Sequence, residues 1–173
     1  MPRLVALYRA LNVGRRRIAN ADLARLHEAA GLADVRTFLA SGNVVFQAPR
    51  GGREALARRL EAAFAAETGF VSEVLLRDAE ELTAAIAANP FLDGGRVPKL
   101  VHTLFLRDAP PPEAVDAVRA AHQGPEEWAV VGREVFVHYV DGSARSALDL
   151  SGFGMGTARN ANTVERLLAL VQG

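Results

Sequence analysis

The sequence predicts an α+β fold in which helices cover an antiparallel sheet. Short, nearly continuous apolar runs alternate with segments whose apolar residues recur every three or four positions, which is typical of buried strands and amphipathic helices. In the first half of the chain these segments follow the order strand, helix, strand, strand, helix, strand. This βαββαβ order is the split βαβ, or ferredoxin-like, arrangement.

The first four segments carry separate signals. Residues 4–11 form an apolar run too short and continuous for a surface helix, so we expect a strand. Asn20 is placed to cap the following helix, and Gly31 to end it. Residues 35–39 and 44–47 are rich in β-branched and aromatic residues, and the glycine between them favours a hairpin turn.

A second amphipathic helix closes at Gly69, after which residues 70–76 return as a strand. A third helix is expected to begin with Asp78 and Glu81, which are spaced as a capping pair, and to end before Asn89-Pro90.

The second half repeats most of this order, as a related βαββα unit without a closing strand. Residues 100–106 form a strand, three prolines open a helix, and a hairpin turns at Gly132-Arg133. The glycine-rich run 151–157 reads as a flexible tether leading to the last helix, for which Asn162 is the expected cap. We therefore expect a single domain over residues 1–173, with halves 1–90 and 98–173 joined by a linker at 90–98.

The composition is that of an ordinary folded protein. Half of the 173 residues are hydrophobic, and 20 Lys and Arg balance 20 Asp and Glu, so any anion binding must be local. There is no cysteine, which excludes disulfides and thiolate chemistry and favours a cytoplasmic location. No secretory signal or run of about 20 apolar residues is present, so we expect no membrane association.

Three polar clusters at 11–17, 41–43 and 157–163 mix small turn residues with arginine and asparagine. Strand alternation places Arg9 on the same face as Val5 and Leu7, where a charge needs a carboxylate partner or a ligand. The run Arg15 to Arg17 lies between a strand and a helix, where guanidinium groups and helix amides together can hold a phosphate or carboxylate. A solvated loop explains the same run without any function.

The sequence offers little support for metal, cofactor or nucleophilic chemistry. The four histidines show no paired metal spacing, so no metal site and no cofactor are expected. The glycine-rich run 151–157 matches neither a P-loop nor G-x-G-x-x-G, and no nucleophile motif is present. Whether the protein is an enzyme stays open.

Three stretches, Leu7–Gly14, Val35–Phe46 and Arg159–Val164, carry motifs that are distinctive in combination. They resemble the bacterial family called domain of unknown function 1697, whose motifs are roughly L-R-G-I-N-V-G-G, T-Y-x-x-S-G-N-V-x-F and R-N-W-N-T. The resemblance covers nearly the whole chain and implies a ferredoxin-like fold, but no established biochemical role. This sequence departs from the pattern at five positions, which are Ala10 and Arg15 in place of glycines, Asn20 in place of methionine, Ala147 in place of lysine and Ala161 in place of tryptophan.

The candidate ligand-binding residues are Arg9, Asn12, Gly14, Arg15, Ser41, Asn43, Arg145, Arg159, Asn160 and Asn162. The leading hypothesis is a binding protein for a phosphate-bearing small molecule or nucleotide. One alternative is RNA binding on an open sheet face, which requires exposed aromatic side chains on the strands, for which the candidates are Tyr8, Phe38, Phe46, Phe136 and Tyr139. The others are a transferase or hydrolase with an unrecognised site, and a homo-oligomeric interaction module.

Overall fold

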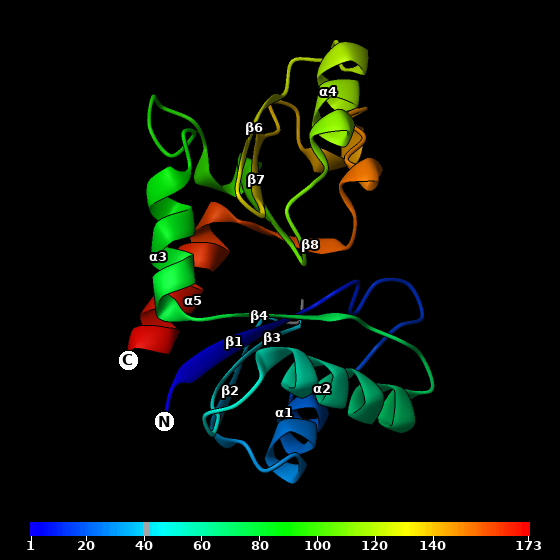
Figure 1. Ribbon diagram of the computed structural model, residues 1–173, viewed down its shortest axis with the longest axis vertical. Coiled ribbons are helices and arrows are strands. Elements are labelled where there is room, and N and C mark those ends of the chain that lie inside the picture. Colours follow the sequence, from blue (N-terminus) through cyan, green and yellow to red (C-terminus); the bar gives the residue numbers. More distant parts are fainter. Residues whose placement is uncertain (40–41) are drawn as a thin grey trace. The chain divides into compact units, whose positions relative to one another are not determined.

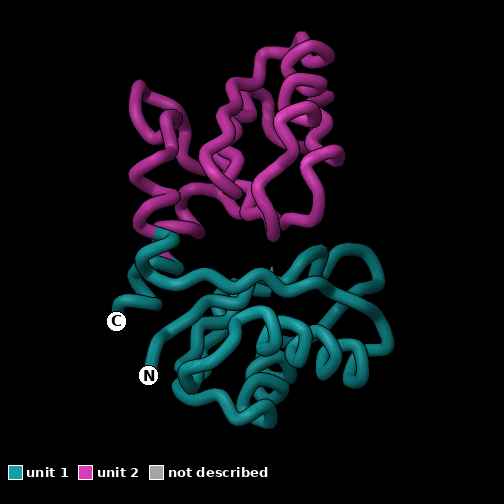
Figure 2. Tube along the Cα trace, in the orientation of Figure 1, with its two compact units in different colours: residues 1–82, 167–173 teal, residues 83–166 magenta. Residues whose placement is uncertain are grey.

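The computed structural model describes residues 1–39 and 42–173 and divides the chain into two compact units (Figure 2). The first unit contains residues 1–82 and 167–173, and the second contains residues 83–166. Each unit holds a four-stranded sheet whose neighbouring strands are antiparallel, which confirms the α+β class. Within the described ranges, no helix combines the length and apolar character that crossing a membrane requires.

The first unit is built from the N-terminal elements (Figure 1). In chain order these are β1 (Arg3–Tyr8), α1 (Asn20–Ala29), β2 (Ala33–Phe38), β3 (Asn43–Gln47), α2 (Arg53–Thr68) and β4 (Val74–Arg77). The helix α3 (Ala79–Ala88) begins in this unit, and the end of α5 (Ala161–Gln172) belongs to it. The strand order β2-β3-β1-β4 places β1 in the interior of the sheet, between β3 and β4.

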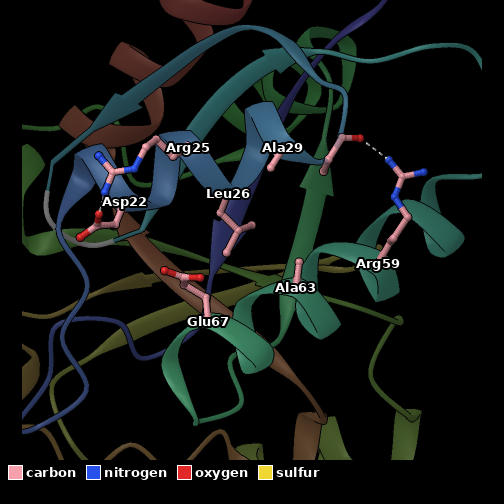
Figure 3. A pocket seen from close by; sticks show the side chains of 8 residues that line it. Asp22, Arg25, Leu26, Ala29, Arg59, Ala63 and Glu67 are labelled. Carbon is pink, nitrogen blue, oxygen red and sulfur yellow. Dashed lines mark hydrogen bonds and ion pairs between the residues drawn. The ribbon is translucent and has the colours of Figure 1, made fainter.

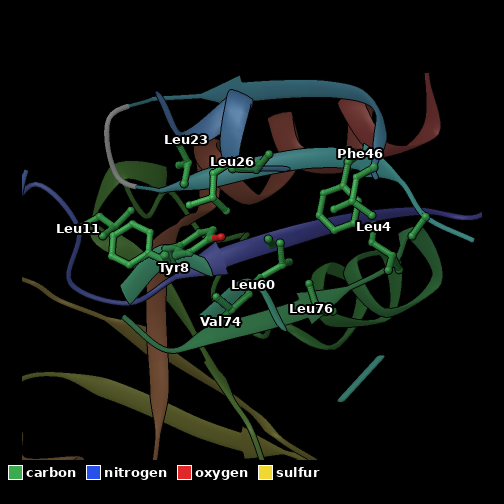
Figure 4. Packing of buried hydrophobic residues seen from close by; sticks show 14 residues of the cluster. Leu4, Tyr8, Leu11, Leu23, Leu26, Phe46, Leu60, Val74 and Leu76 are labelled. Carbon is green, nitrogen blue, oxygen red and sulfur yellow. The ribbon is translucent and has the colours of Figure 1, made fainter. Parts of the chain in front are cut away.

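The core of this unit lies between the sheet and the helices α1 and α2. Leu4, Ala6 and Tyr8 of β1 pack in one cluster with Leu23 of α1 and Phe64 of α2 (Figure 4). Each large apolar side chain that is fully buried in this way contributes about 1.5–3 kcal/mol. The alternation of side chains along β1 thus fixes which face of the sheet the helices cover.

Two boundaries in this unit differ from the predicted ones. Ala19, in extended conformation, precedes α1 and makes no side-chain cap, so Asn20 is the first helical residue and the predicted cap is wrong. The strand β4 begins at Val74 rather than at residue 70, because its ladder partner Tyr8 is the last residue of β1. The capping pair of α3 is confirmed, since the Asp78 and Glu81 side chains each accept the other's backbone N–H at 2.9 Å.

The strand β2 forms one edge of the sheet and is irregular. Its register against β3 shifts between Ala33 and Arg36, and Asp34 within the bulge has a φ of 49°. Guanidinium groups of Arg3 and Arg36 both donate to the Asp34 carboxylate, at 2.6 and 3.1 Å. Two ion pairs therefore hold the bulge in place.

The second unit contains the remaining elements (Figure 1). They are the 3₁₀ helix η1 (Pro98–Leu100), β5 (Val101–Leu106), α4 (Pro112–Ala121), β6 (Glu127–Val131), β7 (Glu134–His138), the 3₁₀ helices η2 (Ser143–Arg145) and η3 (Ser151–Phe153), β8 (Gly156–Asn160) and the start of α5. The strand order is β6-β7-β5-β8. Residues 90–98 belong to this unit, and the single domain with a linker there stays a prediction.

One core cluster of the second unit lies on one face of its sheet. Leu106, Val135 and Val137 cluster with Phe153 of η3, and side chains of α4 and β6 pack against them. Arg119 of α4 lies over the ring of Trp128, with its guanidinium carbon 5.6 Å from the ring centroid. The helix α4 is thereby held against the sheet by both apolar packing and a cation–π contact.

The strand β8 corrects the prediction for residues 151–157. The expected tether is instead the short helix η3 followed by β8, which closes the sheet beside β5. Thr157 and Arg159 of β8 are buried while Ala158 between them is exposed, which is the alternation of a strand. The strand pattern was not recognised in the sequence because glycines precede β8 and because Arg159 within it is a charged residue at a buried position.

Candidate functional site

Two of the three polar clusters meet at one end of the first unit's sheet. Leu7 pairs with Asn43, and the Tyr8 N–H donates to the Gly42 carbonyl at 2.9 Å, so the end of β1 lies beside the turn before β3. A Cβ at Gly42 would lie 2.8 Å from both Tyr8 Cβ and Leu11 Cδ1. This close approach requires glycine in the turn. Ser41 lies outside the described residues.

The loop of residues 9–18, here called the arginine loop, has an unusual backbone. Ala10, Asn12 and Gly14 have φ values of 55°, 55° and 60°, so every second residue is left-handed. The Asn12 Oδ1 accepts the Ile18 N–H at 3.0 Å, and the Val13 carbonyl accepts the Arg16 N–H at 3.1 Å. The loop is therefore fixed by its own hydrogen bonds, in a conformation that costs alanine about 1–2 kcal/mol.

The guanidinium groups of this loop face solvent. Arg15, Arg16 and Arg17 are all exposed, and no carboxylate of the described residues forms an ion pair with them. Arg16 lies near the Phe70 ring, with its guanidinium carbon 5.8 Å from the ring centroid. Arg15 to Arg17 form a patch of positive charge on a structured loop.

Arg9 differs from these three. It follows Tyr8, the last residue of β1, and its backbone N–H donates to the Glu73 carbonyl at 3.0 Å. Its Nη1 lies 3.5 Å from the Glu73 carboxylate, and 48% of its side chain is exposed. An ion pair this exposed contributes about 0–1 kcal/mol. Arg9 therefore has the carboxylate partner that the sequence left as an alternative to a ligand.

Asn43 has a structural role at the same end of the sheet. It is completely buried, and its Nδ2 donates to the Phe38 carbonyl at 2.9 Å, which closes the turn between β2 and β3. Asn12 and Asn43 thus hold the backbone of the two clusters.

A buried polar pair lies beneath this end of the sheet. Tyr8 and His27 are fully buried, with the Tyr8 hydroxyl 3.5 Å from His27 Nε2 and His27 Nδ1 2.9 Å from the Leu23 carbonyl. Burial lowers the pKa of His27 to about 4 and raises the pKa of Tyr8. No sequence signal indicated that a helical histidine would be buried against a strand tyrosine.

A groove between α1 and α2 contains none of the predicted residues. It has a volume of about 630 Å³ and a floor that includes Leu26, Ala29 and Ala63 (Figure 3). Arg25 on its rim pairs with Asp22, and Arg59 donates to the Ala30 carbonyl at 2.7 Å. Its arginines are therefore already engaged within the protein.

The third cluster lies in the second unit, where Arg159 is buried. Only 7% of Arg159 is exposed, and its Nη1 donates to Thr157 Oγ1 at 2.8 Å and to the Ala158 carbonyl at 2.9 Å. Burial lowers its pKa to about 10, which leaves the guanidinium charged at neutral pH. Its charge is stabilised within the sheet rather than presented to solvent.

Asn160, and not Asn162, caps α5. The Asn160 Oδ1 accepts the Thr163 N–H at 3.0 Å, whereas Asn162 is an exposed residue of the first turn. The predicted cap was two residues too late, because the strand β8 was not recognised and the helix therefore appeared to start later.

Arg145 is exposed at the end of η2, beside a cluster that the sequence did not indicate. A hydrogen bond from the neighbouring Ser146 lowers the pKa of Glu126, and so does His122, whose Nε2 lies 3.0 Å from Glu126 Oε2. Within the described ranges, no three His, Asp or Glu side chains are grouped as a metal site.

Most of the aromatic residues proposed for RNA stacking are buried. Tyr8, Phe46 and Phe136 have no exposed surface, and Tyr8 and Phe46 belong to the core beneath α1 and α2. A base can stack only on an exposed ring. These three side chains are therefore unavailable for RNA recognition on either sheet.

Comparison with known proteins decides the family. The model of a family described as protein of unknown function (DUF1697) matches residues 1–136. The chain belongs to this family. None of the curated proteins compared with it matches. A solved structure, that of the conserved bacterial protein SP0830 from Streptococcus pneumoniae, is similar over 100% of this chain and 99% of that one, with a TM-score of 0.79 and 21% sequence identity. At this identity the similarity supports a common fold.

The family match covers the arginine loop and the turn at Gly42. Arg145, Arg159, Asn160 and Asn162 lie beyond the matched residues. The left-handed φ of 55° at Ala10 is one that glycine adopts without strain.

Proposed function

We propose that this DUF1697 protein binds a phosphate-bearing small molecule or nucleotide at the arginine loop. The observation that supports this most directly is the patch of Arg15, Arg16 and Arg17, which is exposed on a fixed loop and has no carboxylate partner among the described residues. Three adjacent guanidinium groups without counter-charge repel one another, and a bound phosphate relieves that repulsion.

The backbone supports an anion as well. Left-handed residues at alternate positions turn successive N–H groups toward one side, which is the geometry of anion-binding nests. Within the described part of the chain, the Gly14 and Arg15 amides donate to no acceptor. A phosphate at this loop would accept hydrogen bonds from amides and guanidinium groups together.

The same reasoning gives five of the candidate residues a role. Asn12 and Gly14 shape the loop, Asn43 fixes the turn beside it, and Arg9 is held by Glu73 at its edge. The phosphate contacts belong to Arg15, with Arg16 and Arg17 beside it. Ligand binding in this scheme does not require Arg159 or Arg145.

We also propose that the first unit is ferredoxin-like and that the second is related to it. The element order of the first unit, its strand order β2-β3-β1-β4 and the packing of α1 and α2 on one face support this assignment. The order β6-β7-β5-β8 in the second unit places its strands in the corresponding sequence.

Thermal unfolding of the full chain with inorganic phosphate, pyrophosphate or a nucleoside triphosphate tests the proposed binding. A ligand present at about 100 times its Kd stabilises the folded state by about 2.7 kcal/mol. We expect such stabilisation from at least one of these anions at constant ionic strength, and its loss in the double variant Arg15→Gln, Arg17→Gln.

Arg50→Gln is the matched control. Arg50 is exposed and follows β3, whose last residue pairs with Arg3 at the start of β1, so it lies beyond the opposite end of the same sheet. It should bind as the unmodified chain does. The proposal is wrong if no anion stabilises the protein, or if Arg50→Gln weakens binding as much as the double variant.

A further inference from the structure

The second unit contains a separate cavity that the proposed anion site does not use. It has a volume of about 250 Å³ and lies among the end of α3, the segment after it, β5 and the first turns of α5. Its lining consists of Ile86, Asn89, Leu92, Pro98, Thr103, Ala161, Asn162, Val164 and Glu165. All of these residues belong to the second unit.

Among the polar residues that line this cavity, Thr103 is the buried one. Thr103 is 3% exposed and lines the cavity, yet among the described residues its hydroxyl has no hydrogen-bond partner. Because the hydroxyl lines the cavity, a ligand can hydrogen-bond it in place of water.

The rim of the cavity is polar and acidic. Asn162 and Glu165 are exposed on the first turns of α5, and neither side chain is engaged by another described residue. Glu165 is the one ionisable side chain among the nine lining residues that the structure describes. The charge at the rim therefore favours a cation and disfavours a phosphate.

Between floor and rim the walls are aliphatic. Ile86, Leu92, Pro98 and Val164 supply them. At about 30 Å³ for each water in the liquid, the cavity holds roughly eight waters, which corresponds to a ligand of similar size in non-hydrogen atoms. The lining thus combines a buried hydroxyl, aliphatic side chains and an exposed carboxylate.

We propose that this cavity binds a short aliphatic ammonium compound with a hydrogen-bonding group at its other end, such as an amino alcohol. The distal hydroxyl pairs with Thr103, the methylene chain packs against the aliphatic walls, and the ammonium group lies between Glu165 and Asn162. This site is independent of the arginine loop in position and in charge preference.

Titration of the isotope-labelled full chain with aminopentanol, followed by NMR of the backbone amides, tests the proposal. The hydroxyl and ammonium groups of this probe lie at opposite ends of its chain. We expect saturable shifts at Thr103, Asn162 and Val164. Pentylamine lacks the hydroxyl, pentanediol lacks the charge and hydroxypentanoate reverses it, so all three should bind more weakly.

Substitutions separate the two ends of the site. Thr103→Val should weaken aminopentanol binding about fivefold, to the level of pentylamine, without lowering stability, because the removed hydroxyl is unpaired. Glu165→Gln should weaken binding of both amines about threefold, the modest effect expected for an exposed ion pair. Glu113→Gln on α4, exposed and outside the cavity, is the matched control and should change nothing.

Three results would overturn the proposal. These are the absence of saturable shifts at the cavity with aminopentanol, equal or tighter binding of pentanediol or hydroxypentanoate, and equal effects of Glu165→Gln and Glu113→Gln. If Thr103→Val does not fold, Ile86→Phe fills the cavity from its apolar wall and must abolish the shifts. Phosphate binding at the arginine loop is measured separately, so either proposal can fail alone.

Discussion

Removing the imidazole of His27 should flatten the dependence of stability on pH. His27 is fully buried between Tyr8 and Phe46, and burial lowers its pKa from 6.5 to about 4. Above pH 6.5 the imidazole is neutral in both the folded and the unfolded chain. As the pH falls below 6.5, His27 becomes protonated in the unfolded chain but stays neutral in the folded chain until about pH 4. The free energy of unfolding therefore decreases across this pH range.

The magnitude follows from the size of the pKa difference. Each unit of pKa is worth about 1.4 kcal/mol, so the free energy of unfolding should decrease by about 3 kcal/mol between pH 7.5 and pH 4 on account of His27. Urea unfolding of the unmodified chain and of His27→Leu at several pH values measures this decrease. Leucine is apolar and of similar size, so the variant retains the packing and lacks the proton site.

The difference between the two curves isolates His27, because carboxylates that titrate in the same range contribute equally to both. Leu26→Val, on the same helix, is the control for general destabilisation and should lower the curve without changing its slope. Parallel curves for His27→Leu and the unmodified chain would refute the reasoning, since they would mean that His27 takes up its proton equally in both states.

Three further predictions test the loop, the turn and the last helix by urea unfolding. Ala10→Gly should stabilise the protein by about 1 kcal/mol, because the φ of 55° strains alanine; destabilisation would contradict this. Gly42→Ala should lower the free energy of unfolding several times as much as Gly14→Ala. A Cβ at Gly42 would meet two side chains at 2.8 Å, whereas a Cβ at Gly14 would meet nothing within 4 Å; equal losses would contradict this. Asn160→Ala should lower the free energy of unfolding by about 1 kcal/mol because the helix loses its cap, whereas Asn162→Ala should hardly change it. A larger loss for Asn162→Ala would mean that Asn162 is the cap.

Much of the fold could be predicted from apolar periodicity and turn residues. The interior strand β1 has a continuous apolar sequence because both of its faces are buried. The helix ends at Gly31 and Gly69 carry left-handed backbone, which is the reason for glycine there. The reciprocal cap of Asp78 and Glu81 follows from their spacing alone. Signals that act within a few residues were dependable at these positions, whereas the caps predicted at Asn20 and Asn162 were wrong.

Two of the failures come from burial of a polar side chain. Arg159 made β8 look unlike a strand, yet it is buried and bonded to Thr157 in the same strand. Arg77 is 1% exposed in β4, and its sequence position marked only the end of an apolar run. Such burial depends on neighbouring strands distant in sequence, β5 beside Arg159 and β1 beside Arg77, so periodicity does not reveal it.

The candidate site also combines features that can be recognised in the sequence with features that depend on tertiary pairing. The arginines and turn residues could be identified because of their composition, but the approach of the Gly42 turn to the end of β1 depends on strand register. Register is set by tertiary pairing, and a shift of one residue would exchange the two faces of the strand. The sequence could therefore name the clusters but could not place them beside one another.

The bulge in β2 has a consequence for how copies of this protein behave in concentrated solution. An edge strand presents unpaired N–H and C=O groups on which another chain can add a strand, the first step of edge-to-edge aggregation. In β2 the register shift at Ala33 to Arg36 interrupts that row of groups, and Asp34 with its two arginines places charge along it. The irregularity at Asp34 thus protects the sheet against extension by a second molecule.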